Sequence, residues 1–196
     1  MRINFPQTQI NFQKKFITTG TVLKRGRAYE CNIYELDPTE DKDYFTKVKR
    51  DKKWNNSFYL ENIMKDFPKN YAIRTTYSIE NKKGECIGFV NVENDEEENC
   101  LGIDLIETCP KHTSKSKKRE FKLIGTALIN FLINIAKENN FKALTIPAVA
   151  KHSREFYKKY GFCMVYEDYI DAEITADNFD DVLKKNDVRS KKKKKH

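Results

Sequence analysis

The alternation of hydrophobic and polar positions predicts antiparallel strands in the first half of the chain. Two alternating segments, Phe16–Lys24 and Ala28–Leu36, flank the turn Arg25-Gly26-Arg27 and indicate a hairpin. Glycine at the end of Asn81-Lys82-Lys83-Gly84 indicates a second hairpin turn, because it tolerates a positive φ. Apolar residues predict three further strands, at Tyr71–Ile79, Glu85–Val92 and Cys100–Glu107.

Helical periodicity marks the segments between and after these strands. The run Asp37-Pro38-Thr39-Glu40 has the acceptor, proline and acid of a helix start, so we expect a helix over about Pro38–Val48. Ser57 is expected to cap a second helix that ends near Asp66. The strongest signal is the helix over Leu123–Asn139. Its apolar face consists of Ile124, Leu128, Leu132 and Ile135. Shorter helices are expected at Ser153–Tyr160 and Asp177–Asn186.

These elements predict one mixed domain. Phe141–Val149 adds a buried strand, and Cys163–Ile174 adds one or two more. The expected fold is therefore α/β (α+β mixed), with a mostly antiparallel sheet, helices on both faces and a β-α-β-α-β C-terminal half. We expect an N-terminal arm at 1–15, the domain at 16–188 and a disordered basic tail at 189–196.

The positive charge of the chain is concentrated in two places. The 196 residues carry a formal net charge of +8. Lys191–Lys195 holds five positive charges and Lys111–Lys122 holds a net five, which leaves −2 for all other residues. A nucleic-acid-binding face spread over the domain is therefore not indicated, and only the tail favours a polyanionic partner.

Several classes of protein are not indicated by the sequence. No apolar run approaches the roughly 18 residues of a membrane helix, and Met1–Lys15 lacks the apolar core of a secretory signal. Neither a metal site nor a disulfide framework is expected, because the cysteines are odd in number and widely spaced. A cytoplasmic protein fits this pattern best. The five cysteines are Cys31, Cys86, Cys100, Cys109 and Cys163.

Two motifs in the second half carry candidate chemistry. Leu123–Leu128 opens a helix with a glycine, where unpaired N–H groups either bind a phosphate or are ordinarily capped. Phe156–Phe162 reads Phe-Tyr-Lys-Lys-Tyr-Gly-Phe, a short aromatic helix closed by glycine. This helix either packs in the core or places one tyrosine hydroxyl in a cleft, where it can donate a proton.

In their order and spacing, these motifs resemble the GNAT superfamily of acyl-CoA N-acyltransferases. Gly125-Thr126-Ala127-Leu128 resembles the end of the family's pyrophosphate-binding motif, and Phe156–Phe162 resembles its late Phe-Tyr-x-x-x-Gly-Phe motif. The resemblance covers about Tyr71–Tyr169. The chain departs from the family at three positions. Glu120 replaces the usual Arg or Gln, Leu123 the usual first glycine, and Ala150 a frequent asparagine.

The resemblance implies transfer of an acetyl group from acetyl-CoA to a primary amine by direct attack in a ternary complex. Tyr157 would protonate the departing sulfur, and acetyl-CoA would lie where the strand ending near Thr108 leaves Leu144–Ala148. The acceptor would be a protein lysine or N-terminus or a small amine. The acidic runs Glu93–Glu98 and Asp177–Asp181 favour a cationic one. Implied acetyl-CoA contacts are Thr108, Cys109, Lys118, Arg119, Lys122, Leu123, Ile124, Gly125, Thr126, Ala150 and Ser153.

Several roles remain open at this point. Asp104 and Glu107 are candidate bases, and strand alternation predicts that they point to opposite faces. Cys109 with His112 would allow a covalent thiol mechanism if the two were hydrogen-bonded. Trp54, Phe58 and Tyr59 either line an acceptor groove or pack in the core. His152 is expected to cap a helix or lie on the surface.

Two alternatives to a simple enzyme are also open. The domain could have lost catalysis and bind nucleic acid or an acidic protein through its basic segment and tail. Alternatively, the tail could tether a partner that the domain then acylates.

Overall fold

The computed structural model describes residues 14–55, 57, 59–66, 74–113, 116, 119–147, 149, 153–164 and 171–187. Most of the expected N-terminal arm and the whole expected basic tail lie outside these residues, as do Lys118, Ala150 and His152.

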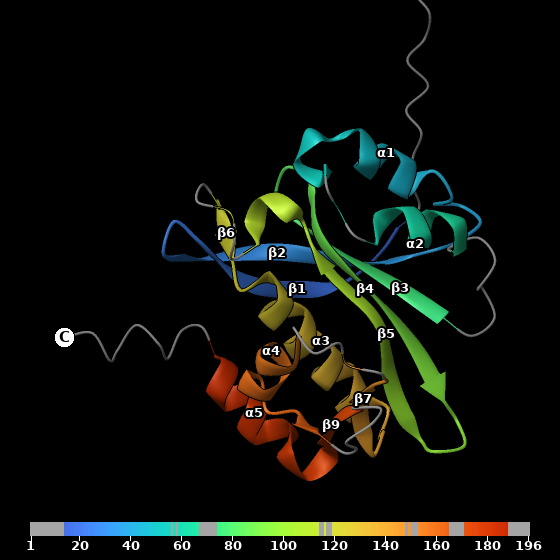
Figure 1. Cartoon of the computed structure of the whole chain (residues 1–196), viewed down its shortest axis with the longest axis vertical. Helices are drawn as coiled ribbons and strands as arrows, with labels where there is room; N and C mark the ends of the chain where they lie inside the picture. Colours follow the sequence, from blue (N-terminus) through green and yellow to red (C-terminus); the bar gives the residue numbers. More distant parts are fainter. Residues whose placement is uncertain are drawn as a thin grey trace, which may run out of the picture.

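The centre of the fold is a nine-stranded sheet in the order β6-β1-β2-β3-β4-β5-β7-β9-β8 (Figure 1). Every pairing is antiparallel except that of β5 with β7. The expected mixed, mostly antiparallel sheet is therefore confirmed. The strands are β1 (Lys15–Lys24), β2 (Arg27–Leu36), β3 (Arg74–Glu80), β4 (Cys86–Asp95), β5 (Cys100–Thr108), β6 (Phe121–Lys122), β7 (Ala143–Ile146), β8 (Cys163–Met164) and β9 (Ala172–Thr175).

Helices cover both faces of the sheet, as expected. On one face, α1 and α2 bury a cluster around Phe45 and Phe89, and on the other α3 buries the larger core (Figure 1). The α-helices are α1 (Tyr44–Arg50), α2 (Leu60–Asp66), α3 (Ile124–Glu138), α4 (Arg154–Lys159) and α5 (Phe179–Asn186). Short 3-10 helices are η1 (Lys52–Trp54), η2 (Pro110–His112) and η4 (Ala176–Asn178).

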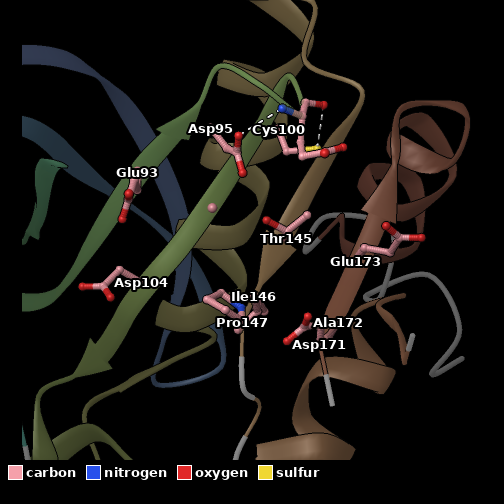
Figure 2. Close-up of a pocket in the computed structure, with 12 residues that line it drawn as sticks. Glu93, Asp95, Cys100, Asp104, Thr145, Ile146, Pro147, Asp171, Ala172 and Glu173 are labelled. Carbon is pink, nitrogen blue, oxygen red and sulfur yellow. Dashed lines mark hydrogen bonds between the residues drawn. The ribbon is translucent and has the colours of Figure 1, made fainter. Parts of the chain in front are cut away.

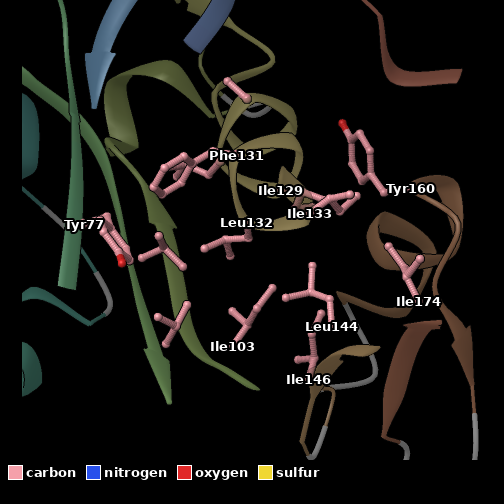
Figure 3. Close-up of a cluster of buried hydrophobic side chains, with 14 of the residues drawn as sticks. Tyr77, Ile103, Ile129, Phe131, Leu132, Ile133, Leu144, Ile146, Tyr160 and Ile174 are labelled. Atoms are coloured by element: carbon pink, nitrogen blue, oxygen red, sulfur yellow. The ribbon is translucent and has the colours of Figure 1, made fainter. Parts of the chain in front are cut away.

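The apolar face of α3 forms the larger core with the sheet (Figure 3). Leu128 and Leu132 are fully buried, and Ile124 is 2 % exposed. Burying each such side chain stabilises the fold by about 1.5–3 kcal/mol. The periodicity of the sequence thus identified the central helix and part of its buried surface. Ile129 and Ile133 are fully buried as well, and Ile135 of the predicted face is half-buried.

The first helix begins later than the sequence predicts. The Asp37 carboxylate accepts hydrogen bonds from the backbone N–H groups of Thr39 (2.7 Å) and Glu40 (3.0 Å). These bonds stabilise a turn before α1, which begins at Tyr44. The expected helix start at Pro38 is wrong because aspartate favours this local turn as readily as a helix N-terminus.

The basic segment between β5 and α3 is anchored to the sheet at its end. Phe121 and Lys122 pair with Lys24 and Leu23 of β1. The Phe121 ring is 1 % exposed, and Lys24 Nζ lies 3.1 Å from a Glu120 carboxylate oxygen. One buried phenylalanine therefore fixes the part of this segment that leads directly into α3.

In the described part of the chain, no helix has the length and apolar character needed to span a membrane.

Candidate active site

A cavity opens where β5 and β7 part. The two strands pair in parallel only over Cys100–Gly102 and Ala143–Thr145. Beyond this point the cavity has a volume of about 180 Å³. Its lining comes from β5, from β7 and the residues after it, from α4 and the residue before it, and from the residue before α2. These residues are Tyr59, Ile103, Asp104, Leu105, Ile106, Ile146, Pro147, Val149, Ser153 and Tyr157. This is where the sequence places acetyl-CoA.

A β-bulge at Asp104 determines which side chains of β5 face α1 and α2. Asn91 of β4 pairs with Leu105 and Val92 with Ile103, so Asp104 has no partner in this ladder. One extra residue reverses the alternation of the strand beyond it. Asp104 and Glu107 therefore lie on the same face, and the expectation of opposite faces is wrong.

The two carboxylates have different surroundings on that face. Asp104 lines the cavity and forms an ion pair with Arg74, with 3.2 Å between Oδ2 and Nη1. Among the described residues, Glu107 does not line the cavity. Its Oε2 accepts hydrogen bonds from Ser57 Oγ (2.8 Å) and from the Tyr59 backbone N–H (3.3 Å). Of the two candidate bases, only Asp104 therefore borders the cavity.

Tyr157 of α4 and Tyr160 at its C-cap make different contacts, which assign them different roles. The Tyr160 hydroxyl oxygen accepts a hydrogen bond from Thr126 Oγ1 (2.8 Å) and so joins α4 to the first turn of α3. Tyr157 lines the cavity and is 8 % exposed. Burial, with a smaller effect of Tyr59, raises the pKa of Tyr157 to about 12. Its phenol therefore stays protonated at neutral pH and can donate a proton.

The start of α3 keeps a feature expected for an anion site, although its sequence differs from the family motif. Leu123, which stands at the usual first glycine, adopts the left-handed conformation that favours glycine (φ 65°, ψ 25°). No side chain among the described residues caps this helix end. The N–H groups of its first turn are therefore not occupied by a capping side chain. A pyrophosphate site requires such uncapped N–H groups.

Gly125 has a packing role that the sequence did not reveal. A Cβ at this position would lie 3.0 Å from the Phe156 ring. Gly125 thus lets α4 rest against the first turn of α3. The Phe156 ring occupies the space where a Cβ of Gly125 would lie. A phosphate therefore cannot approach Gly125 from this side, although the sequence predicts such a close approach.

The other expected acetyl-CoA contacts among the described residues lie between the end of β5 and α3, except Ser153, which directly precedes α4. Thr108 ends β5 and Ser153 lines the cavity. Lys122 is exposed, and Arg119 is half-buried. Glu120, at the position of the usual Arg or Gln, is paired with Lys24.

Cys109 is not placed as a nucleophile. Its thiol donates a hydrogen bond to the Lys53 carbonyl (3.2 Å), and burial raises its pKa to about 11. The His112 ring packs edge-on against Phe121, with 5.1 Å between centroids. The structure therefore does not form the thiol–imidazole pair that a covalent mechanism needs.

The aromatic residues before α2 divide between the core and the cavity. Trp54 stacks on Phe89 (5.3 Å between centroids) and donates its indole N–H to the Cys86 carbonyl (3.1 Å). Trp54 is therefore a core residue, whereas Tyr59 lines the cavity. Phe58 lies outside the described residues.

An acidic pocket of about 480 Å³ adjoins the cavity and shares Asp104, Ile146 and Pro147 with it. Figure 2 shows its labelled side chains on β4, β5, β7 and the start of β9. The sequence drew attention to the Glu93–Glu98 run but missed Asp171 and Glu173. Strand pairing places Glu173 opposite Thr145 of β7 and brings Asp171, just before β9, next to it. No local sequence pattern indicates this. The carboxylates of the pocket are Glu93, Asp95, Glu98, Asp104, Asp171 and Glu173.

The second acidic run of the sequence lies elsewhere. Asp180 of α5 is paired with Lys137, and Asp181 is paired with Lys184. Within the described ranges, no group of three or more His, Cys, Asp or Glu side chains could hold a metal ion.

Comparison with solved structures identifies the architecture. A putative GNAT acetyltransferase from Desulfovibrio desulfuricans matches with a TM-score of 0.56 at 11 % identity, over 74 % of this chain and 99 % of that one. A variant of the Vibrio cholerae spermidine N-acetyltransferase matches with a TM-score of 0.53 at 13 % identity (76 % and 95 %). A Thermoplasma acidophilum N-acetyltransferase in complex with coenzyme A matches with a TM-score of 0.50 at 16 % identity (73 % and 98 %). None of the curated proteins matches this sequence.

The match to a sequence family defines the class of the protein as an acyltransferase. The sequence model described as Acetyltransferase (GNAT) family matches residues 32–162. The chain belongs to this family, and the family resemblance of its sequence is confirmed.

Proposed function

We propose that this protein transfers an acetyl group from acetyl-CoA to a primary amine. The observation that carries the proposal is the cavity between β5 and β7, which the protonated phenol of Tyr157 borders. A proton donor at this position can protonate the sulfur as the C–S bond breaks, so that the sulfur leaves as a thiol. The free cysteines of the chain support placing this reaction in the cytoplasm.

The proposed acetyl-CoA contacts follow the elements around this cavity. The end of β5, from Glu107 through Thr108 to Cys109, would lie along the pantetheine arm. The Cys109 N–H already donates to the Ile87 carbonyl (2.9 Å), so Cys109 would contribute other contacts. The first turn of α3 would hold the pyrophosphate. Further proposed contacts are Lys118, Arg119, Lys122, Leu123, Ala150 and Ser153.

In the proposed reaction, the neutral amine attacks the thioester carbon and the C–S bond breaks. Tyr157 gives its proton to the departing sulfur, which leaves as a thiol, and the phenolate then regains a proton from solvent. The nitrogen loses a proton, and we assign Asp104 to receive it and pass it to solvent, since Asp104 is the candidate base that lines the cavity. A base is needed because the nitrogen becomes positively charged when it attacks and must lose a proton to give the neutral amide. The net products are an N-acetyl amide and the free thiol.

The acidic pocket supports a cationic acceptor, such as a polyamine or the lysine side chain of a protein. Its carboxylates lie next to the cavity, and an amine with a second positive charge would gain Coulomb attraction there. The V. cholerae structural neighbour is a spermidine N-acetyltransferase, which agrees with this proposal.

The proposal is tested by following thiol release from acetyl-CoA with spermidine, a lysine peptide or no amine. We expect acetylated product by mass spectrometry and thiol release that depends on the amine. Asp171→Asn combined with Glu173→Gln should raise the KM for spermidine about tenfold, equivalent to about 1.4 kcal/mol. The affinity for acetyl-CoA should stay unchanged.

The matched control is Asp180→Asn combined with Asp181→Asn, which removes the same charge from α5, outside the pocket. This control should leave the KM for spermidine unchanged. Absence of amine-dependent thiol release with every acceptor contradicts the proposed function. Equal KM changes in the two double variants contradict the proposed acceptor path.

A further inference from the structure

Glu107 of β5 connects this strand to the start of α2. Its Oε2 accepts one hydrogen bond from Ser57 Oγ (2.8 Å) and one from the Tyr59 N–H (3.3 Å). Ser57 Oγ in turn accepts a hydrogen bond from the Leu60 N–H (3.0 Å), which caps α2 as the sequence predicts. The Glu107 carboxylate on β5 therefore holds both Ser57, which caps α2, and Tyr59, which directly precedes the first residue of α2.

Both backbone polar groups of Tyr59, its N–H and its carbonyl, form hydrogen bonds. Its N–H donates to Glu107, and its carbonyl accepts from the Ile63 N–H (3.0 Å) in the first turn of α2. The half-buried Tyr59 side chain lines the same cavity as Tyr157. Tyr59 and Tyr157 therefore border one cavity, from the start of α2 and from α4 respectively. The cavity therefore has a second phenol, whose position depends on Glu107.

We propose that Tyr59 contacts the acceptor amine and that Glu107 is its positioning residue, an assignment that rests on the proposed acetyl transfer. The Tyr59 phenol oxygen accepts an N–H of the attacking amine and directs the nitrogen lone pair toward the thioester carbon. This hydrogen bond strengthens as positive charge develops on the nitrogen, so it stabilises the transition state more than the ground state. Glu107 takes no proton in this assignment.

A positioning role and a role as base predict different results for the conservative variant. Glutamine at position 107 keeps an oxygen that accepts hydrogen bonds from Ser57 and Tyr59, but it cannot accept the amine proton. Glu107→Gln should therefore keep kcat/KM for the amine within about threefold and leave the pH profile unchanged. Glu107→Ala, which removes the acceptor, should lower kcat/KM about tenfold or more through misplacement of the amine.

The experiment is a double-mutant cycle on kcat/KM for spermidine with Glu107→Ala, Tyr59→Phe and both together. If Glu107 acts through Tyr59, the double variant should lose little more than Tyr59→Phe alone. Acetyl-CoA affinity and thermal melting, measured on every variant, separate an acceptor effect from unfolding or lost acetyl-CoA binding.

The outcomes are distinct. Losses that multiply in the double variant overturn the coupling of Glu107 to Tyr59. A loss in Glu107→Gln as large as in Glu107→Ala, with a changed pH profile, makes Glu107 the base. Undiminished kcat/KM in Tyr59→Phe removes Tyr59 from the acceptor site. Wild-type protein that acetylates no amine instead contradicts the proposed function, on which this inference depends.

Discussion

Replacing Tyr157 by phenylalanine should lower kcat for acetyl transfer about 100-fold and leave the affinity for acetyl-CoA nearly unchanged. The phenol borders the cavity and donates only when the C–S bond breaks, so its loss affects the transition state and not binding of the substrate. Rapid-mix thiol release gives kcat, and calorimetry gives the affinity. Undiminished turnover in Tyr157→Phe would remove Tyr157 from the role of acid.

The pH dependence provides a second check on Tyr157. A proton donor must be protonated, and burial raises the pKa of Tyr157 to about 12. Activity should therefore show no alkaline decline from this group up to about pH 10. It should instead rise with pH as the acceptor amine, with a pKa of about 10.4, loses its proton. A decline near pH 8 that disappears in Tyr157→Phe would contradict this assignment.

Tyr160→Phe is the matched control for Tyr157→Phe. The Tyr160 hydroxyl is bonded to Thr126 and serves the junction of α4 with α3. Its removal should lower the free energy of unfolding by about 1 kcal/mol with little change in kcat. A 100-fold loss of kcat in this control would show that the aromatic junction, and not one phenol, governs the rate.

Gly161→Ala should lower the free energy of unfolding by about 3 kcal/mol. Gly161 has a φ of +93°, and a Cβ there would lie 2.7 Å from Val182 Cγ2 of α5. Both the backbone strain and the steric overlap oppose a side chain. For a chain of this size, the melting temperature should fall by about 6–12 °C, measured by calorimetry.

Gly26→Ala separates the two causes. Gly26 also has a positive φ, +79°, but no heavy atom lies within 4 Å of the position of its Cβ. Only the backbone strain applies, so this variant should lose about 1 kcal/mol. Equal losses in the two variants would contradict close packing of Gly161 against Val182.

The parts of the fold that could be predicted from sequence depend on local rules. The apolar period of α3 identified the helix and three of its buried residues, Ile124, Leu128 and Leu132. Gly84 and Gly161 marked chain reversals, and both have positive φ. Ser57 caps α2 through the Leu60 N–H as expected. Each of these features depends on residues a few positions apart, so a local pattern contains the necessary information.

The parts that the sequence did not reveal depend on contacts between distant segments. The bulge at Asp104 arises from pairing with β4, and it places both candidate bases on one face. Gly125 packs under Phe156, about thirty residues away along the chain. Asp171 joins the acidic pocket only because β9 pairs with β7. No periodicity encodes these relations.

The central claim is that acetyl-CoA binds between β5 and β7 and at the start of α3. Hydrogen–deuterium exchange, measured by mass spectrometry with and without millimolar acetyl-CoA, tests it most directly. We expect protection of the backbone amides at 105–108 of β5 and at 124–126 of α3, with no change in β1, which lies between β6 and β2. No protection at millimolar acetyl-CoA, or protection confined to β1 and the α3 face beside it, would contradict the claim.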